Sequence, residues 1–219
     1  MIKASLRNTV ANTEELFKLV QLGLDNQLRF LSVTNLNDVT PFLSKELESH
    51  RVANENYFQF GNMRLITGVL LWVSYGAHSD ADLRIPVLGY NFDAEKLHVA
   101  LEKTHMQLRE DQEYLDSYVA INAIKEAGGQ VFLAISNMHP LPDLTKLDEI
   151  FVHHYKMLDG VEGVAPAFTA DYEKFLKQYA HSMGIQIAGG DGYFPKLPTD
   201  QFAKTLVPKS PLTLWLWTL

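Results

Sequence analysis

One segment of the sequence carries glutamate and histidine at a spacing that could bind a metal ion. Glu149 and His153 lie four residues apart in a stretch of helical periodicity, so both would lie on one helix face. His139, on the proline-rich connector before it, could join them. The segment is not the two-histidine motif of zinc peptidases, because its first position is a glutamate. Such pairs are common by chance, so we interpret these residues as surface or hydrogen-bonded side chains and predict no metal and no cofactor.

Other patterns associated with catalysis are incomplete. Ser74 lacks the preceding glycine of a nucleophile elbow. The run Gly189-Gly190-Asp191-Gly192 is not followed by the lysine and hydroxyl residue of a phosphate-binding loop, so we interpret it as a hinge. His98, Glu102 and His105 could line one edge of a helix, but the pattern favours its solvent side. No catalytic constellation is predicted, and we expect a protein that is not an enzyme.

Arginine and aromatic residues are mixed in the N-terminal half of the chain. This mixture suits a groove for single-stranded RNA, because guanidinium groups bind phosphates and aromatic rings stack on bases. The alternative is ordinary ion pairing of the arginines with acidic neighbours such as Glu48 and Asp82. The residues predicted to contact nucleic acid are Arg29, Arg51, Arg64, Arg84, Tyr57 and Phe58.

The C-terminal end, 211–219, contains two tryptophans and four leucines, which would favour aggregation if they stayed in water. The segment could fold back on its own domain, or it could dock on a neighbouring subunit as exchanged arms do in oligomers. We predict the second arrangement. The residues predicted to make these contacts are Leu212, Leu214, Trp215, Leu216, Trp217 and Leu219.

Composition indicates an ordinary globular protein of 219 residues with a formal net charge of −7 and no cysteine. The negative charge argues against a surface dominated by phosphate contacts but permits a local basic groove. The lack of cysteine excludes disulfides and thiolate sites and is consistent with a reducing compartment. No signal peptide is visible, and the apolar run 65–75 is too short to span a bilayer. We therefore expect a cytoplasmic protein, or a virion protein if it is viral, with no membrane contact.

The longest segment with one consistent period is 92–129. Asp93 is suited to cap a helix, apolar residues follow at alternating spacings of four and three, and Gly128 with Gly129 would end it. We predict a long central helix over 92–128, about 50 Å long if it is uninterrupted. The polar run 109–113 leaves open a break near residue 111.

Shorter elements surround this predicted helix. The segment 63–75 is apolar almost all round and predicts a buried helix, in which Gly68 would cost about 1 kcal/mol. The segment 57–60 predicts a short strand, and 130–136 a strand or a helical turn. The segment 85–89 predicts an edge strand at most, because Pro86 cannot donate to a β-ladder. Further helices are predicted after Asn12, from Thr40 to Ala53, over 144–158, and from Thr169 or Asp171 to Gly184.

These elements predict a mainly α fold. It would have an N-terminal arm over 1–11, one helix-rich core domain over 12–187 and an extended C-terminal arm over 188–219. The leading functional hypothesis is a self-assembling structural protein, such as a viral nucleocapsid or coat subunit that encloses nucleic acid and exchanges arms with its neighbours. The alternatives are a helical regulatory or immunity-type module that recognises a basic protein, and a small helical metalloenzyme. The expected partners are copies of the chain itself and single-stranded RNA.

Overall fold

The computed structural model describes residues 4–75, 84–107, 114–154, 156–165 and 168–189, and these residues form an α/β fold. The strands form two mixed sheets, one with the order β1-β2-β4-β3 and one with the order β10-β9-β8-β6-β5-β7. The strands of the first sheet are β1 (Ala4–Ser5), β2 (Phe30–Ser32), β3 (Tyr57–Phe60) and β4 (Met63–Ile66). Those of the second are β5 (Gly68–Ser74), β6 (Arg84–Tyr90), β7 (Leu115–Asp116), β8 (Gln130–Leu133), β9 (Gly160–Val164) and β10 (Gln186–Gly189).

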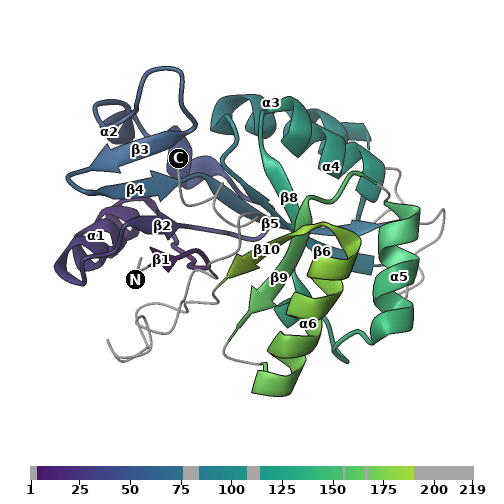
Figure 1. Cartoon of the computed structure of the whole chain (residues 1–219). Helices are drawn as coiled ribbons and strands as arrows, with labels where there is room; N and C mark the ends of the chain where they lie inside the picture. The colour runs from purple at the N-terminus through teal and green to yellow at the C-terminus, as the bar shows by residue number, and fades with distance from the viewer. Residues whose placement is uncertain (1–3, 76–83, 108–113, 155, 166–167, 190–219) are drawn as a thin grey trace.

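Helices cover the outer faces of the sheets (Figure 1). Helices α3 to α6 lie beside the second sheet, and α1 and α2 lie beside the first. The helices are α1 (Thr13–Asp25), η1 (Thr40–Leu43), α2 (Lys45–Glu48), α3 (Ala94–Gln107), α4 (Ser117–Glu126), η3 (Ile135–Asn137), α5 (Leu144–His153) and α6 (Ala170–Met183). The prediction of a mainly α fold is therefore wrong.

Two hydrophobic clusters stabilise this arrangement. The larger lies between the helices and the strands. The smaller takes side chains from strands of both sheets. Its fully buried aromatic members include Tyr90 of β6 and Phe132 of β8, whose ring centroids lie 6.0 Å apart. Because both faces of many strands are buried, their sequences lack the alternation of a half-exposed strand.

That double burial explains the error at residues 63–75, which form β4 and β5 instead of a core helix. Gly68 begins β5 where this strand passes close to the end of β2. A Cβ atom at this position would lie 2.5 Å from the carbonyl oxygen of Val33. The glycine is thus required by close backbone packing between strands, and an apolar run without a period was misread as a helix.

The predicted helix over 92–128 is two helices separated by a strand. Asp93 does cap α3, since its Oδ1 accepts from the backbone N–H groups of Glu95 and Lys96. Leu115 then pairs with Val73 in the sheet, and Asp116 caps α4 through the amides of Tyr118 and Val119. Residues 108–113, with the polar run, lie outside the described residues. The capping residue Asp116 therefore begins a second helix within the segment 92–128, whose periodicity alone predicted one continuous helix.

The segment 85–89 is also different from the prediction, because β6 is a central strand between β5 and β8. The carbonyl oxygen of Pro86 accepts from the N–H of Ala134, just past the end of β8 at Leu133. The N–H and C=O of a strand residue point to the same side, so the missing proline N–H faces the place where β8 ends. The sheet accommodates Pro86 there.

Several local predictions are confirmed. The Asn12 side chain caps α1 and that of Thr169 caps α6, which ends at Gly184 in the left-handed conformation with φ 65°. The strand predicted at 57–60 is β3, and of the alternatives left open for 130–136 the strand is found as β8, followed by the turn η3. Within the segment predicted as an N-terminal arm, Ala4 and Ser5 form β1. None of the described helices combines the length and the hydrophobicity needed to cross a membrane.

Candidate active site

A polar cluster lies beside the ends of two strands and the middle of a third. Arg7 follows β1, Ser136 and Asn137 belong to η3 just after β8, and Glu162 is the middle residue of β9. The sequence separations are long, 155 residues between Arg7 and Glu162, so only the fold brings these side chains together. In β/α folds of parallel strands, ligands bind at the carboxyl ends of the strands.

The guanidinium of Arg7 is the centre of this cluster. Its Nη1 donates to Glu162 Oε1 at 2.9 Å and to Ser136 Oγ at 2.5 Å. Its Nη2 donates to Asn137 Oδ1 at 2.6 Å. The second carboxylate oxygen of Glu162 accepts from the backbone N–H of Ser136 at 2.7 Å. The guanidinium therefore connects the end of β1 in one sheet to the end of β8 and the middle of β9 in the other.

The Arg7–Glu162 ion pair is almost withdrawn from solvent. The side chain of Arg7 is 11% exposed and that of Glu162 is 2% exposed. At such burial the two charges depend on each other and on their hydrogen-bond partners, because neither is well hydrated. Ser136 and Asn137 are partly exposed and form the solvent side of the cluster.

The buried side chain of Asn8, the residue after Arg7, anchors this segment to the first sheet. Asn8 Nδ2 donates to the carbonyl oxygen of Ser32 at 2.8 Å, and the N–H of Thr34 donates to the carbonyl oxygen of Asn8 at 2.7 Å. The hydroxyl of Tyr90 donates to the carbonyl oxygen of Leu6 from the smaller hydrophobic cluster. The backbone on both sides of Arg7 is thus fixed, which preorganises the direction of its side chain.

A second polar cluster joins the end of β5 to α5. Lys146 Nζ donates to Tyr75 Oη at 2.9 Å and to Glu149 Oε2 at 3.1 Å, and Tyr75 Oη donates to Glu149 Oε1 at 2.9 Å. The hydrogen bonds from Lys146 and then from Tyr75 lower the pKa of Glu149. His153 packs its ring against Tyr75, with 4.9 Å between centroids. Glu149 and His153, the sequence-predicted metal pair, thus lie near each other, but Glu149 is occupied by Lys146 and Tyr75.

The buried imidazole of His154 connects α5 to the start of α4. Its Nδ1 lies 2.9 Å from the carbonyl oxygen of Ile150 and donates to it, which leaves Nε2 to accept from Ser117 Oγ at 2.9 Å. Burial lowers the pKa of His154 below 6.5; the neighbouring His153 lowers it further, while Asp116 opposes the shift. The hydrogen bond to the backbone of Ile150 also opposes it. The neutral form is therefore the one that the fold favours.

Stability is expected to fall as the pH drops below 6.5, the ordinary pKa of histidine. The unfolded chain then takes up a proton that folded His154 resists, and the loss continues until the pH reaches the lower pKa of the folded state. For this one group the loss is at most about 1.4 kcal/mol per pH unit. Urea unfolding at about pH 7.5 and about pH 5.5 measures it. The variant His154→Gln should lose less stability on acidification than the wild type, and an equal loss in both would contradict the assignment.

Five of the six residues predicted to bind RNA lie in or beside the first sheet, and Arg84 lies in β6 of the second, so the prediction of an RNA-binding surface stays open. Arg51 binds Glu48 at 2.7 Å, the guanidinium of Arg64 lies 4.8 Å from the ring centroid of Tyr57, and Arg84 donates to the hydroxyl of Tyr114. The remaining arginine, Arg29, is exposed. The rings of Tyr57 and Phe58 are buried, at 8% and 0% exposure, so they are not available for stacking on bases in this structure.

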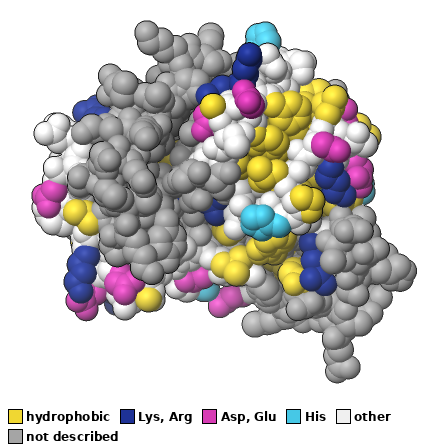
Figure 2. Space-filling model, turned by 90° about the horizontal axis from the view of Figure 1, so that it is seen from below, with side chains coloured by type: hydrophobic (Ala, Val, Ile, Leu, Met, Phe, Trp, Pro, Cys, Tyr) yellow, Lys and Arg dark blue, Asp and Glu magenta, His cyan; other side chains and the backbone are white. Residues whose placement is uncertain are grey.

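The residues predicted to mediate oligomerisation, from Leu212 to Leu219, lie outside the described residues, and that prediction stays open. Exposed hydrophobic side chains do occur on the described helices, among them Leu144 and Val152 of α5 and Met183 of α6. Figure 2 shows hydrophobic side chains gathered on the face that it displays, with acidic and basic side chains around them.

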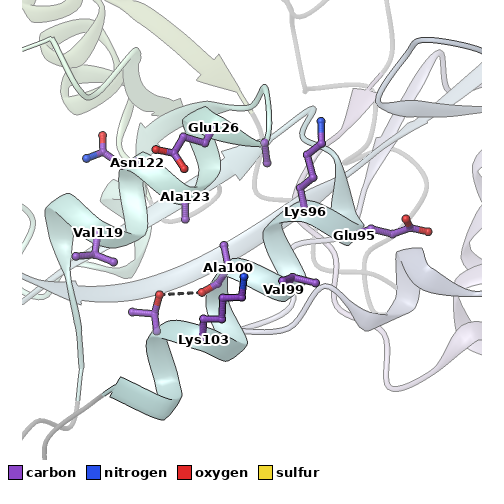
Figure 3. A pocket seen from close by; sticks show the side chains of 11 residues that line it. Glu95, Lys96, Val99, Ala100, Lys103, Val119, Asn122, Ala123 and Glu126 are labelled. Carbon is purple, nitrogen blue, oxygen red and sulfur yellow. Dashed lines mark hydrogen bonds between the residues drawn. The ribbon is translucent and has the colours of Figure 1, made fainter.

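A groove of about 860 Å³ lies between α3 and α4 (Figure 3). Lys96, Val99 and Lys103 line it from α3, and Val119 and Glu126 line it from α4. Val99 and Val119 are about half exposed, which places the groove on the outer helical layer. The groove is built from other residues than the Arg7–Glu162 cluster.

Sequence reasoning missed all four members of the Arg7–Glu162 cluster. Arg7 lies in the segment interpreted as an arm, and Glu162 lies between the helix predicted over 144–158 and the one predicted from Thr169 or Asp171. The available signal was weak. Short apolar runs, 131–135 among them, each end in a polar residue, and polar residues after buried strands are candidates for a site at a sheet edge.

Comparisons of the structure with solved structures identify the fold. An amidohydrolase from Chromobacterium violaceum, whose structure contains sulfate and no metal, has a TM-score of 0.65 at 12% identity, and the alignment covers 87% of each chain. A protein from Bifidobacterium adolescentis described as a metal-dependent phosphoesterase has a TM-score of 0.58 at 12% identity, with 92% of this chain and 93% of that one covered. The lesion-specific endonuclease EndoQ from Pyrococcus furiosus has a TM-score of 0.54 at 13% identity, and the alignment covers 86% of this chain and 47% of the endonuclease. No protein-family model matches the sequence, and no curated protein matches it either.

These similarities correct the functional predictions. The chain has an α/β fold that it shares with proteins described as hydrolases and a nuclease. The hypotheses of a viral nucleocapsid or coat subunit, of a helical binding module, of a helical metalloenzyme and of a protein that is not an enzyme are contradicted by this fold. They depended on a mainly α architecture and on the lack of a local catalytic motif.

Proposed function

We propose that the chain is a hydrolase of esters that carry a negatively charged oxygen, phosphoesters above all. We propose that it binds them at the Arg7–Glu162 cluster. The observation that carries the proposal is the guanidinium of Arg7, which follows β1 and is held by Ser136 and Asn137 after β8 and by Glu162 of β9. The fold shared with an amidohydrolase and a phosphoesterase supports the reaction class.

The chemistry of the cluster favours an oxyanion as ligand. A guanidinium presents planar N–H donors whose geometry matches a phosphate or a carboxylate. Ser136 Oγ and Asn137 Oδ1 accept from Arg7, so the Ser136 hydroxyl and the Asn137 amide can donate to a ligand on the solvent side.

The substrate is expected to be small. The chain has a net charge of −7, Arg51 is paired with Glu48 and Arg84 donates to the hydroxyl of Tyr114, so we expect a long polyanion to meet little basic surface. One phosphoester group on a small molecule requires only the local charge of Arg7. We propose phosphate monoesters and diesters of small alcohols as the class to test.

In the proposed hydrolysis, the oxygen of water bonds to phosphorus, the P–O bond to the alcohol breaks, and the alcohol leaves with a proton. Negative charge on the non-bridging oxygens is stabilised by preorganised donors, and Arg7 has that role here. Glu162 does not need to touch the substrate. It is a positioning residue, because it fixes the guanidinium through Nη1.

Wild-type protein is expected to release nitrophenol from p-nitrophenyl phosphate or from bis(p-nitrophenyl) phosphate. The variant Arg7→Lys keeps the charge but loses the planar pair of donors, and we expect kcat/KM to fall about 10²- to 10³-fold, as for loss of one oxyanion donor. Circular dichroism checks that the variant is folded. The matched control is Arg51→Lys, which alters an exposed Arg–Glu pair and should retain full activity. Lack of turnover of both esters by the wild type, or unchanged kcat/KM in Arg7→Lys, would overturn the proposal.

The description of the B. adolescentis protein implies a metal ion, and the described residues of this chain do not fit one. Hydrolytic metal sites use several histidine and carboxylate ligands. Within the described ranges, no group of three or more His, Cys, Asp or Glu residues is placed to hold a metal. In the cluster itself, both oxygens of Glu162 are used by Arg7 and by the amide of Ser136. We therefore assign no step to a metal.

A further inference from the structure

The fold resembles that of a protein described as metal-dependent, but the described residues of this chain do not provide a set of metal ligands. Among the described residues of the Arg7–Glu162 cluster, the groups that meet are a carboxylate, a guanidinium, a hydroxyl and an amide. The guanidinium has five donors and no acceptor, so it cannot ligate a cation and instead competes with one for the oxygens around it. Those oxygens, Glu162 Oε1, Ser136 Oγ and Asn137 Oδ1, all accept from Arg7.

We infer that the guanidinium of Arg7 takes the place of a metal cation, so that the site binds its oxyanion through a tethered positive charge and works without divalent metal. This inference rests on the proposed oxyanion site and specifies which group supplies the positive charge there. Oxygens of Glu162, Ser136 and Asn137 surround the guanidinium of Arg7 as ligands would surround a metal ion.

The geometry of the pair supports this role. The oxygens around Arg7 come from the end of β8 and from β9, as the ligands of a bound ion would come from several strand ends. The cation cannot dissociate, and it does not lose its charge, because an arginine stays protonated in proteins. The side chain of Arg7 is 11% exposed, and Ser136 and Asn137 beside it are partly exposed, so the proposed ligand would reach the guanidinium from their side of the cluster.

A divalent ion is disfavoured at this position for two reasons. It would have to displace Arg7 from the carboxylate of Glu162, and the displaced guanidinium would then be a buried positive charge without its partner. If Arg7 stayed, the ion would be repelled by a like charge at close range in a site of low exposure. Either arrangement is worse than the existing ion pair.

The test uses the full-length wild-type chain, dialysed against EDTA, with inorganic phosphate, MnCl₂ and ZnCl₂ as probes in thermal denaturation and titration calorimetry. Phosphate at about 100 times its Kd should raise Tm by about 5–10 °C, to the same extent with and without EDTA. Neither metal salt should bind stoichiometrically at this cluster. The variant Arg7→Gln should lose the phosphate response, and the control Arg51→Gln should keep it.

The outcomes separate the inference from the proposed function. Phosphate binding that persists in EDTA, together with no ester hydrolysis, would uphold the tethered cation and overturn the hydrolase. Hydrolysis or phosphate binding that disappears in EDTA and returns with Mn²⁺ or Zn²⁺ would overturn the tethered cation and leave the hydrolase standing. Failure of phosphate to bind under any of these conditions would also overturn the inference. Because these readings use the wild-type chain, they do not depend on whether Arg7→Gln folds.

Discussion

Replacing Arg7 with leucine is expected to destabilise the folded protein by about 3–5 kcal/mol. The substitution leaves Glu162, whose side chain is 2% exposed, as a buried carboxylate with only the Ser136 amide as a described hydrogen-bond donor. It also removes the connection from the end of β1 to the end of β8 and to the middle of β9. Urea unfolding followed by far-ultraviolet circular dichroism measures the loss.

The chain offers a matched control for this experiment. Arg51 and Glu48 also form an Arg–Glu pair, at 2.7 Å, but their side chains are 28% and 50% exposed. Solvent screening makes such a pair worth only about 0–1 kcal/mol, so Arg51→Leu should cost little. The double variant Arg7→Leu with Glu162→Leu should recover part of the loss, because it leaves no unpaired buried charge. If Arg7→Leu destabilised the protein as little as Arg51→Leu, the Arg7–Glu162 pair would not be the buried ion pair described above.

Replacing Gly68 with alanine is expected to destabilise the protein by about 1–3 kcal/mol, the usual cost of overpacking a close contact. The new Cβ would lie 2.5 Å from the carbonyl oxygen of Val33 and also against Ser32, and the backbone of β2 cannot move away without disturbing its pairing with β4. If residues 63–75 were a helix, the same substitution would stabilise by about 1 kcal/mol through helix propensity. The sign of the change therefore distinguishes the two folds.

The control for Gly68→Ala is Gly23→Ala in α1. There the new Cβ would meet the flexible end of Met63, with Sδ at 2.7 Å and Cε at 3.3 Å, and a side-chain end can move aside. The gain in helix propensity, about 1 kcal/mol, offsets the adjustment, so the change should be small. Equilibrium unfolding of both variants in urea gives the comparison. Stabilisation by Gly68→Ala would contradict the strand assignment.

Local signals in the sequence were sufficient for the ends of several helices. A cap depends on a side chain and on amides two or three residues away, so Asn12, Asp93 and Thr169 could be recognised from their neighbours alone. Gly184 ends α6 for a similarly local reason, its positive φ.

The strands were harder to predict, because their patterns depend on what covers them. The residues of β5 are buried on both faces, one by helices and one by the smaller hydrophobic cluster, and a run such as Val69-Leu70-Leu71 carries no period that separates strand from helix. Pro86 is acceptable in β6 only because of where β8 ends, a fact about another segment. Tertiary context decided both cases.

The candidate site could not be predicted from spacing for the same reason. Glu149 and His153 were candidate metal ligands because they are four residues apart. In the structure, Glu149 instead accepts hydrogen bonds from Lys146 and Tyr75. Arg7 and Glu162 are 155 residues apart and meet only when the strands of the two sheets are assembled. A site built from the ends of several strands leaves single residues in the sequence and no motif.

The most direct test of the tethered cation is X-ray diffraction from crystals of the wild-type protein soaked in MnCl₂ and phosphate, with an anomalous difference map at the strand ends. We predict no manganese peak at Glu162, an Arg7 Nη1 to Glu162 Oε1 contact close to 2.9 Å, and phosphate on the solvent side of the guanidinium. A manganese ion bound to Glu162, with Arg7 turned away from the carboxylate, would contradict the account.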